Sequence, residues 1–428
     1  MNAAQVRQIL FDQKEELDHL LSLDFIDRDE QSMISFDSSL AQVVMGVRRA
    51  GKSILCINAL KKSQKSFAYV NFDDEILAKA KAADLGLILE GLYRLYGDFE
   101  VLFIDEVQNV DEWHLFINKL LRQGMKILLT GSNSKLLSRE LATHLTGRCH
   151  PIELFPFSFA DYCKIRNVDI SSFSTKKVAF LKNAFDDYMK TGGFPELSSD
   201  RHIDSFTYVN NLLSSILTQD IENRFKVRYK AAFENFANHL FNQVPFEISI
   251  QSLSKQFGFR SFHTTENYIS YLKQAYLLIG VHKFSSKSRI RMTGEKAYPV
   301  DCSIMNNRMN AFSQDNLGWR LECIVLLELL KRYRNNGCDI YYYRNNKTEC
   351  DFMVLRGAQV LQCIQVCLDP ANEKTMNREL KGLEEASSAS HCDQLFILTL
   401  DMNTELKLQD GTAVKVIPVC EWAVIRKE

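Results

Sequence analysis

The residues Gly46 to Ser53 constrain the fold of this chain more than any other segment. They read GVRRAGKS, which fits the pattern G-x-x-x-x-G-K-[ST], and they follow the apolar run Ala41 to Met45. Glycines allow the sharp turn with which a loop brings its N–H groups against phosphate oxygens. The pattern therefore predicts a strand, a phosphate-binding loop (a Walker A motif) and a helix that begins at the end of the loop.

Each part of this octet has a predicted role in binding a nucleotide. Lys52 can reach the β- and γ-phosphates, and the Ser53 hydroxyl is suited to hold Mg²⁺. The helix over Ile54 to Leu60 would direct the positive end of its dipole at the phosphates. The predicted contacts form one continuous set: Gly46, Val47, Arg48, Arg49, Ala50, Gly51, Lys52, Ser53 and Ile54.

A second motif, VLFIDE over Val101 to Glu106, ends in two adjacent carboxylates. A short, continuous apolar run is typical of a strand that is buried on both faces of a parallel sheet. Ligands bind at the carboxyl ends of such strands, so Asp105 is predicted to hold Mg²⁺. Glu106 would orient or deprotonate the attacking water, and this Walker B arrangement favours a hydrolase over a kinase.

Polar residues also follow a third apolar strand, Lys126 to Thr130. Ser132 or Asn133 would lie beside the γ-phosphate and sense it through a hydrogen bond, although Gly-Ser-Asn is also ordinary turn chemistry. Further along, Arg148 ends the segment LTGR. Its guanidinium could neutralise γ-phosphate charge in its own subunit or in a neighbour, and a structural role on the surface stays an alternative.

These motifs and their surroundings resemble one family of prokaryotic AAA-type ATPases. Members carry a C-terminal domain of unknown function that is related to restriction-endonuclease folds. The resemblance implies ATP as the nucleotide, and no guanine-reading N-K-x-D motif is present. It rests on the segments GVRRAGKS, YVNFDD, VLFIDEVQNVDEW, LLTGSNSKLLSRE, LTGRCHPIELFPFSFADY, TGGFPEL, ILTQDIENR and TTENYISYLKQAYLL.

Composition limits the classes of protein that this chain can belong to. Its 428 residues favour two or three domains. The net charge of −1 provides no global basic field for nucleic acid. No apolar run reaches the roughly 18 residues needed to span a bilayer, and the charged N-terminus is unlike a signal peptide. Eleven cysteines without a C-x-x-C pair suggest reduced thiols in a cytoplasmic protein.

Apolar runs and helical patterns alternate over the first part of the chain, which predicts an α/β fold with a parallel sheet. The candidate strands are 42–45, 67–71, 101–104, 126–130 and 151–154. We predict four parts: an N-terminal helix with a P-loop ATPase core over 1–155, a helical lid over 156–235, a winged-helix-like domain over 236–300, and an α/β restriction-endonuclease-like domain over 301–428.

The winged-helix prediction rests on two helical patterns, Ile248 to Phe257 and Thr264 to Leu278, followed by a candidate hairpin. Residues 260–291 would be the DNA-contacting part, with the second helix in a major groove and cations on the phosphates. Four cations are few for tight binding, so a helical pair used only for packing or protein contacts is an equal alternative. The cations are Lys283, Lys287, Arg289 and Arg291.

The last part of the chain departs from the nuclease pattern in one place. Glu322 lies on a predicted helix over 319–331, and Asp351 leads into a predicted strand, as in nucleases that bind Mg²⁺ through carboxylates. The expected E-x-K is replaced by Gln365-Val366-Cys367. A neutral amide is a poor Mg²⁺ ligand, and a thiol does not supply the cation. We predict a nuclease-like scaffold that has lost hydrolysis and serves binding or assembly.

Together these motifs predict Mg²⁺-dependent ATP hydrolysis that drives a conformational switch. Two alternatives stay open. In the first, the chain is a DNA-binding module in which ATP only gates residence on nucleic acid. In the second, it is a nucleotide-dependent scaffold with negligible turnover. The sequence does not identify the protein partner, and a trans role for Arg148 would require a homo-oligomer.

Overall fold

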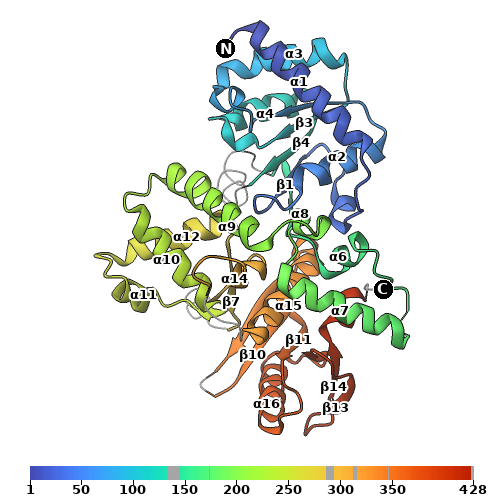
Figure 1. Cartoon of the computed structure of the whole chain (residues 1–428), viewed down its shortest axis with the longest axis vertical. Coiled ribbons are helices and arrows are strands. Elements are labelled where there is room, and N and C mark those ends of the chain that lie inside the picture. Colours follow the sequence, from blue (N-terminus) through green and yellow to red (C-terminus); the bar gives the residue numbers. More distant parts are fainter. Residues whose placement is uncertain are drawn as a thin grey trace. The chain divides into compact units, whose positions relative to one another are not determined.

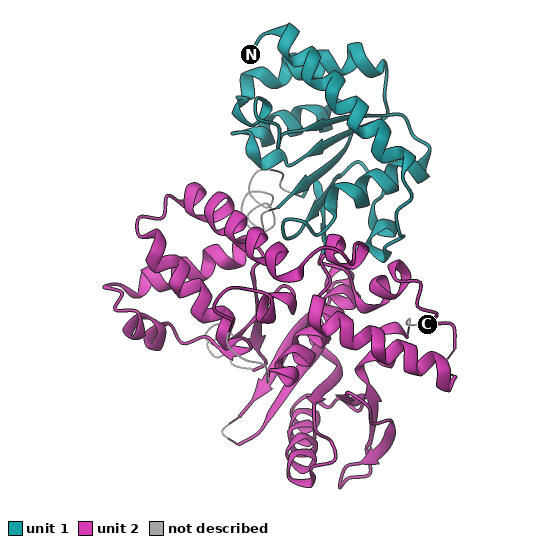
Figure 2. Cartoon of the chain, viewed as in Figure 1, with its two compact units in different colours: residues 1–154 teal, residues 155–428 magenta. Residues whose placement is uncertain are grey.

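The computed structural model (Figure 1) describes residues 1–132, 145, 147–172, 174–285, 294–311, 316–345 and 347–425. The chain separates into two compact units, residues 1–154 and residues 155–428 (Figure 2). The first unit ends one residue before the end of the first predicted part, residue 155. Among the described helices, none has the length and apolar character needed to cross a membrane. All eleven cysteines are free, and ten of them are buried.

Unit 1 contains a five-stranded sheet in the order β2-β3-β4-β1-β5, in which all neighbours are parallel. This confirms the predicted α/β fold, because all five strands lie within two residues of their predicted ends. The elements are α1 (Ala3–Ser22), β1 (Ala41–Met45), α2 (Lys52–Ser63), β2 (Phe67–Asn71), α3 (Leu85–Tyr96), β3 (Val101–Asp105), α4 (Trp113–Arg122), β4 (Lys126–Gly131) and β5 (Cys149–Glu153). Short 3₁₀ helices cover Asp29–Met33, Leu77–Lys79, Ala82–Asp84 and Val107–Asn109.

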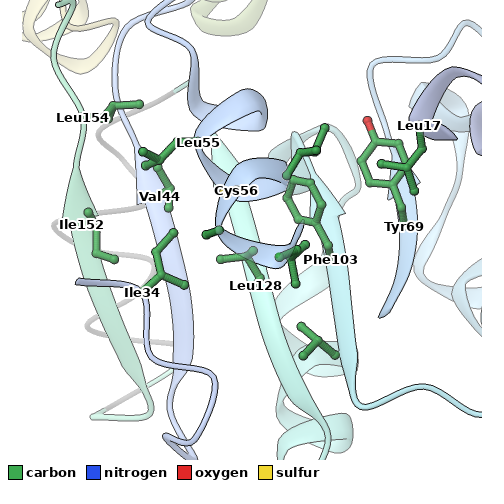
Figure 3. Packing of buried hydrophobic residues seen from close by; sticks show 14 residues of the cluster. Leu17, Ile34, Val44, Leu55, Cys56, Tyr69, Phe103, Leu128, Ile152 and Leu154 are labelled. Atoms are coloured by element: carbon green, nitrogen blue, oxygen red, sulfur yellow. The ribbon is translucent and has the colours of Figure 1, made fainter. Parts of the chain in front are cut away.

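Helices α1 and α2 cover one face of this sheet (Figure 3). Leu17 of α1 and Leu55 of α2 belong to a buried cluster with Val44, Phe103 and Leu128, which come from three different strands. Each such side chain contributes about 1.5–3 kcal/mol when it is fully buried. The cluster therefore fixes α2, and with it the loop that precedes α2, on the central strands.

The strand order determines which residues meet at the carboxyl edge of the sheet. β4 lies between β1 and β3, so the end of β4 separates the glycine loop after β1 from Asp105 at the end of β3. In parallel strands these ends all point the same way. Gly46, Asp105 and Ser132 are consequently brought to one edge.

Unit 2 is built on a nine-stranded mixed sheet in the order β13-β14-β12-β11-β10-β9-β7-β8-β6. Its helices are α6 (Phe159–Ile165), α7 (Thr175–Thr191), α8 (Pro195–Ser199), α9 (Ser205–Ser215), a π-helical segment (Ile216–Asn223), α10 (Lys230–Gln243), α11 (Ile250–Gln256), α12 (Phe262–Gln274), α14 (Ser303–Asn306), α15 (Leu317–Tyr333), a 3₁₀ turn (Arg334–Asn336), α16 (Glu373–Ser390) and α17 (Val419–Val424). Its strands are β6 (Phe246–Glu247), β7 (Leu278–Lys283), β8 (Glu295–Pro299), β9 (Asp339–Arg344), β10 (Glu349–Arg356), β11 (Gln359–Cys367), β12 (Leu395–Thr399), β13 (Thr404–Lys407) and β14 (Ala413–Pro418).

Residue 300, the predicted boundary between the third and fourth parts, lies within unit 2. β7 pairs antiparallel with β8, as a hairpin would, but it also pairs in parallel with β9, through His282 opposite Tyr341. The strands before and after residue 300 therefore form one sheet. The preceding helices α11 and α12 do pack together, and α12 begins at Phe262, capped by Ser261, rather than at Thr264. The predicted wing cations Lys287, Arg289 and Arg291 lie outside the described residues.

The segment predicted as a lid, residues 156–235, is helical as expected but belongs to unit 2. α6 and α7 pack against α17, and α7 also contacts α14 and α15. These helices therefore share a core with the C-terminal elements. Their predicted closure over the nucleotide stays a prediction.

A tight turn between α7 and α8 contains Gly192 and Gly193. Gly192 has φ of +77°, and a Cβ built on it would lie 1.9 Å from Asp301 Oδ1. The backbone N–H of Gly193 donates to Asp301 Oδ2 at 2.8 Å, and the N–H of Ser303 donates to Asp301 Oδ1 at 2.9 Å. The buried carboxylate thus fixes this turn, so the two glycines serve close packing here.

We expect Gly192→Ala to destabilise unit 2 by about 2–4 kcal/mol, since it combines backbone strain with a steric clash. Gly318→Ala is the matched control, because a Cβ at Gly318 would meet Leu368 at an ordinary 3.8 Å. Urea denaturation of both variants measures the difference. Equal stability of Gly192→Ala and wild type would contradict this account of the turn.

Candidate active site

The glycine loop between β1 and α2 has the backbone that its sequence predicts. A Cβ on Gly46 would lie 1.9 Å from the carbonyl oxygen of Leu154, so no other residue fits where the end of β5 approaches β1. Gly51 has φ of +88° and is the N-cap of α2. The helix therefore begins at Lys52, and its N-terminus faces the loop.

Lys52 is held inside the loop that it is predicted to serve. Its side chain is only 4% exposed, and Nζ lies 3.6 Å from Glu106 Oε1. Nζ also donates to the carbonyl oxygen of Val47 at 3.3 Å. The ammonium group thus already lies between the glycine loop and the end of β3, the place where phosphates of a nucleotide would bind.

Asp105 is buried at the end of β3 and accepts several hydrogen bonds. Thr130 Oγ1 donates to Oδ1, the Tyr69 hydroxyl donates to Oδ2 at 3.4 Å, and the Ser53 hydroxyl also bonds the carboxylate. Burial raises the pKa of Asp105 to about 6, helped by Glu106 and opposed by Thr130, Ser53 and Lys52. The two predicted Mg²⁺ ligands, Ser53 and Asp105, are therefore in direct contact.

Glu106 adopts a left-handed backbone conformation with φ of 52°. Its N–H donates to Thr130 Oγ1 at 3.0 Å, while its carboxylate accepts from the amide of Gln108 and from the N–H of Ser132 at 3.3 Å. Burial alone would raise the pKa of Glu106. Lys52, Gln108 and Ser132 outweigh that effect, so the pKa lies below its usual value. Glu106 is consequently a charged, oriented carboxylate at neutral pH.

The remaining predicted residues fall in different places. Arg48 forms an ion pair with Asp73 at 3.3 Å. The carbonyl oxygen of Arg148 accepts from the N–H of Ala41, at the start of β1. That is the edge of the sheet opposite the glycine loop, about 13 Å away at 3.3 Å per residue. Within unit 1 the fold therefore does not bring Arg148 to the loop, and Asn133 lies outside the described residues.

Three residues of the site were not predicted. Thr130 bridges Asp105 and Glu106 from the end of β4, Gln108 positions Glu106, and Tyr69 donates to Asp105. Thr130 carried a signal, because it is the last residue of a predicted strand that ends beside the carboxylates. Tyr69 and Gln108 lie inside recognised segments, but their contacts depend on strand order.

The raised pKa of Asp105 predicts a pH-dependent stability. The folded carboxyl binds its proton at about pH 6 and the unfolded one at about 3.9, so its contribution favours folding at low pH and is lost as the pH rises from about 4 through about 6. Relative to Asp105→Asn, the nucleotide-free wild type should lose on the order of 3 kcal/mol between about pH 4 and pH 7. Urea denaturation measures this loss, and a pH-independent difference would contradict the shift.

Unit 2 has a second candidate site, a cavity of about 700 Å³. The four residues predicted as a nuclease-like remnant, Glu322, Asp351, Gln365 and Cys367, all line it. They come from α15, β10 and β11. Lys296 of β8, which belongs to no sequence motif of this site, lines the same cavity.

Lys296 supplies a cation to this cavity. Its Nζ lies 3.5 Å from Glu322 Oε1 and pairs with Glu349 as well. Burial lowers the pKa of Lys296, but Glu322, Asp351 and Glu349 outweigh that effect and hold it above its usual value. Burial and Glu322 also raise the pKa of Asp351 well above its usual range. Within the described part of the chain, no group of three or more His, Cys, Asp or Glu side chains is arranged to hold a metal ion.

The oxygen and the nitrogen of the Gln365 side-chain amide both form hydrogen bonds within the protein. Its Oε1 accepts from the N–H of Asp351 at 3.2 Å, and its Nε2 donates to Glu379 of α16. Asp351 Oδ2 in turn accepts from the N–H of Val366 at 2.9 Å. The position where a second carboxylate was expected is thus a neutral group within an internal hydrogen-bond network.

Three family models match successive parts of the chain. The AAA domain family matches residues 38–163, and two domains of unknown function, DUF8612 and DUF4143, match residues 182–315 and 317–422. An uncharacterized protein of Methanocaldococcus jannaschii is 31% identical over 396 residues, which cover 90% of this chain and 88% of that protein. An uncharacterized protein of Haemophilus influenzae is 28% identical over 354 residues, covering 79% of this chain and 85% of that protein.

Solved structures show weaker similarity. The Walker-type ATPase of Pyrococcus abyssi has a TM-score of 0.43 and 13% identity, over 67% of this chain and 98% of that chain. The RuvB Holliday junction branch migration motor of Thermotoga maritima has a TM-score of 0.30 and 17% identity, over 62% of this chain and 87% of that chain. The AAA domain match and the identity along the Methanocaldococcus jannaschii protein show that this chain belongs to that protein's family, a family of prokaryotic P-loop ATPases.

Proposed function

We propose that unit 1 binds Mg²⁺·ATP at the carboxyl edge of its sheet and hydrolyses it. One observation carries the proposal: Lys52, Ser53, Asp105 and Glu106, which come from two distant motifs, converge in one contact network. Structural ion-pair networks also perturb pKa values, but here the network lies beside a glycine loop and a helix N-terminus. That combination favours a nucleotide site.

The residues present fit a hard divalent cation. Ser53 and Asp105 offer oxygen ligands that already touch each other, and oxygen is the donor that Mg²⁺ prefers. When bound, Mg²⁺ would neutralise negative charge on the phosphates. Thr130 and Tyr69 hold the Asp105 carboxylate in place for that role.

Glu106 would act as the general base that takes a proton from the attacking water. Its lowered pKa keeps it charged, and Gln108 and Ser132 orient its carboxylate. Lys52 Nζ lies 3.6 Å from Glu106 Oε1. Phosphate oxygens would compete for Lys52, so nucleotide binding would release Glu106 for catalysis. Ser132 would then sense the γ-phosphate.

Hydrolysis would reposition unit 2 and the helices predicted as a lid, which is the proposed conformational switch. Because Arg148 lies at the far edge of its own sheet, we assign any contact with the γ-phosphate to a second copy of the chain. We therefore also propose a homo-oligomer. The proposed ligand is ATP, and an unidentified protein is the proposed partner.

Titration with a fluorescent ATP analogue, with and without Mg²⁺, tests the binding step. We expect saturable binding that is tightened by Mg²⁺ and displaced by unlabelled ATP more readily than by GTP. Absence of displaceable binding at millimolar nucleotide would overturn the proposal.

The arrangement of α11 and α12 supports DNA binding as a second candidate, in which ATP gates residence on nucleic acid. The two helices pack together before a strand pair, and Arg260 between them is exposed. Lys273, by contrast, is engaged by Glu295 at 2.5 Å. Binding to a duplex would weaken steeply with salt, with a slope of about −0.9 for each phosphate neutralised. ATP turnover without any DNA affinity would instead favour a protein partner, and ATP binding without turnover would favour a scaffold.

For the cavity of unit 2 we propose binding or assembly rather than hydrolysis. The neutral Gln365 and Cys367, and the internal pairing of Lys296 with carboxylates, support this choice. Incubation of the protein with plasmid DNA and Mg²⁺ or Mn²⁺ tests it. Cleavage that is lost in Asp351→Asn would overturn the proposal.

A further inference from the structure

Arg28 lies in the segment between α1 and β1, before the region that the AAA domain family matches, which begins at residue 38. Its side chain is buried in unit 1, and NH1 donates to the carbonyl oxygen of Ala50 at 2.9 Å. NH2 lies 3.4 Å from Glu30 Oε1, with both side chains about 5% exposed or less. A cation from outside the matched domain therefore contacts the backbone of the glycine loop.

The segment that carries Arg28 is itself anchored to α2. Asn58 Nδ2 donates to Asp27 Oδ1 at 3.3 Å and to Gln31 Oε1 at 3.1 Å, on either side of Arg28. Lys61 Nζ donates to the carbonyl oxygen of Leu23 at 3.1 Å. Because α2 begins directly after the loop, these contacts keep the guanidinium in register with Ala50.

The contact has a direct consequence for the loop. A peptide unit is planar and trans, so the carbonyl of Ala50 and the N–H of Gly51 point in opposite directions. With the carbonyl held toward Arg28, the N–H of Gly51 faces away from Arg28. A hydrogen bond from a charged donor is roughly twice as strong as a neutral one, and it polarises the peptide that accepts it.

We infer that Arg28 is a positioning residue for phosphate binding, which acts by fixing and polarising the Ala50–Gly51 peptide of the glycine loop. The inference rests on the proposed nucleotide site. Arg28 would act on the loop in every nucleotide complex, so its loss should weaken ATP and ADP by the same factor. Glu30 would orient the guanidinium without contacting the loop.

Equilibrium titration of ATP and ADP on the full chain tests this. Arg28→Met keeps the volume but removes donor and charge, and we expect both dissociation constants to rise about tenfold at unchanged stoichiometry. Arg28→Lys keeps the charge and should restore most of the affinity, and Arg28→Gln, a neutral donor, should be intermediate. Lys61→Met is the matched control, since it removes one contact between the same segment and α2, leaves the two contacts from Asn58 in place and does not touch the loop.

Stoichiometry separates this role from a merely structural one. A partly unfolded variant binds fewer equivalents of nucleotide, whereas its folded fraction keeps the wild-type affinity. Wild-type affinity in Arg28→Met, or weakening in Lys61→Met of the same size, would overturn the inference; if Arg28→Met does not fold, wild-type affinity in Arg28→Gln would do so. Failure of the wild type to bind ATP would overturn the proposed function itself.

Discussion

Replacing Glu106 by Gln should lower ATP turnover by a factor of about 10²–10⁴ and leave ATP binding intact. The substitution keeps the shape of the side chain and its hydrogen bond with Ser132, but an amide does not accept the proton of the attacking water. Binding could tighten slightly, because one negative charge beside the phosphates is removed and Lys52 loses its carboxylate partner. Phosphate release and nucleotide titration, measured on the same protein, separate the two effects.

Glu112→Gln is the matched control for this variant. Glu112 is exposed, lies close to Glu106 in sequence and also has a positive φ, of 58°. It therefore reproduces the change in charge outside the network. Turnover by Glu106→Gln at the wild-type rate would show that another group activates water.

Replacing Lys52 by Met should weaken ATP binding by roughly 10–100-fold, the range that 1.5–3 kcal/mol for a charged hydrogen bond implies. The loss has two physical causes. The phosphates lose a buried cation, and Glu106 is left beside them without its counter-charge at 3.6 Å. Lys52 would also stabilise the charge that develops on the phosphoryl group during hydrolysis, so turnover should fall further than binding.

Lys61→Met controls for the loss of one lysine from the same helix. Lys61 is 39% exposed in its side chain and pairs with Asp24 rather than with the loop. Titration of ATP on both variants gives the comparison. Equal affinities would contradict the assignment of Lys52 to the phosphates.

The carboxyl edge of the first sheet could be predicted because local patterns carry it. The octet Gly46 to Ser53 and the apolar run that ends in Asp105 each indicate a strand and the chemistry at its end. Thr130 could not be assigned a partner in the same way. Its contact with Asp105 exists only because β4 lies between β1 and β3, and strand order is a property of the whole sheet.

Arg148 and Lys296 show where local sequence patterns fail to predict the position of a side chain. The motif around Arg148 suggested a phosphate contact, but β5 runs parallel to β1, which places the start of β5 at the far edge. Lys296 lies on a strand assigned to another domain, and only the shared nine-stranded sheet brings it to Glu322. Arg28 has no local motif at all, and its contact with Ala50 depends on how the N-terminal segment packs against α2.

The most direct test of the proposed activity is the rate of phosphate release from ATP by the purified wild-type chain, with Mg²⁺ and with EDTA, in the presence and absence of double-stranded DNA. We expect Mg²⁺-dependent turnover that exceeds that of Glu106→Gln by at least about 10²-fold. ATP bound without turnover under every condition, or turnover equal to that of Glu106→Gln, would contradict it.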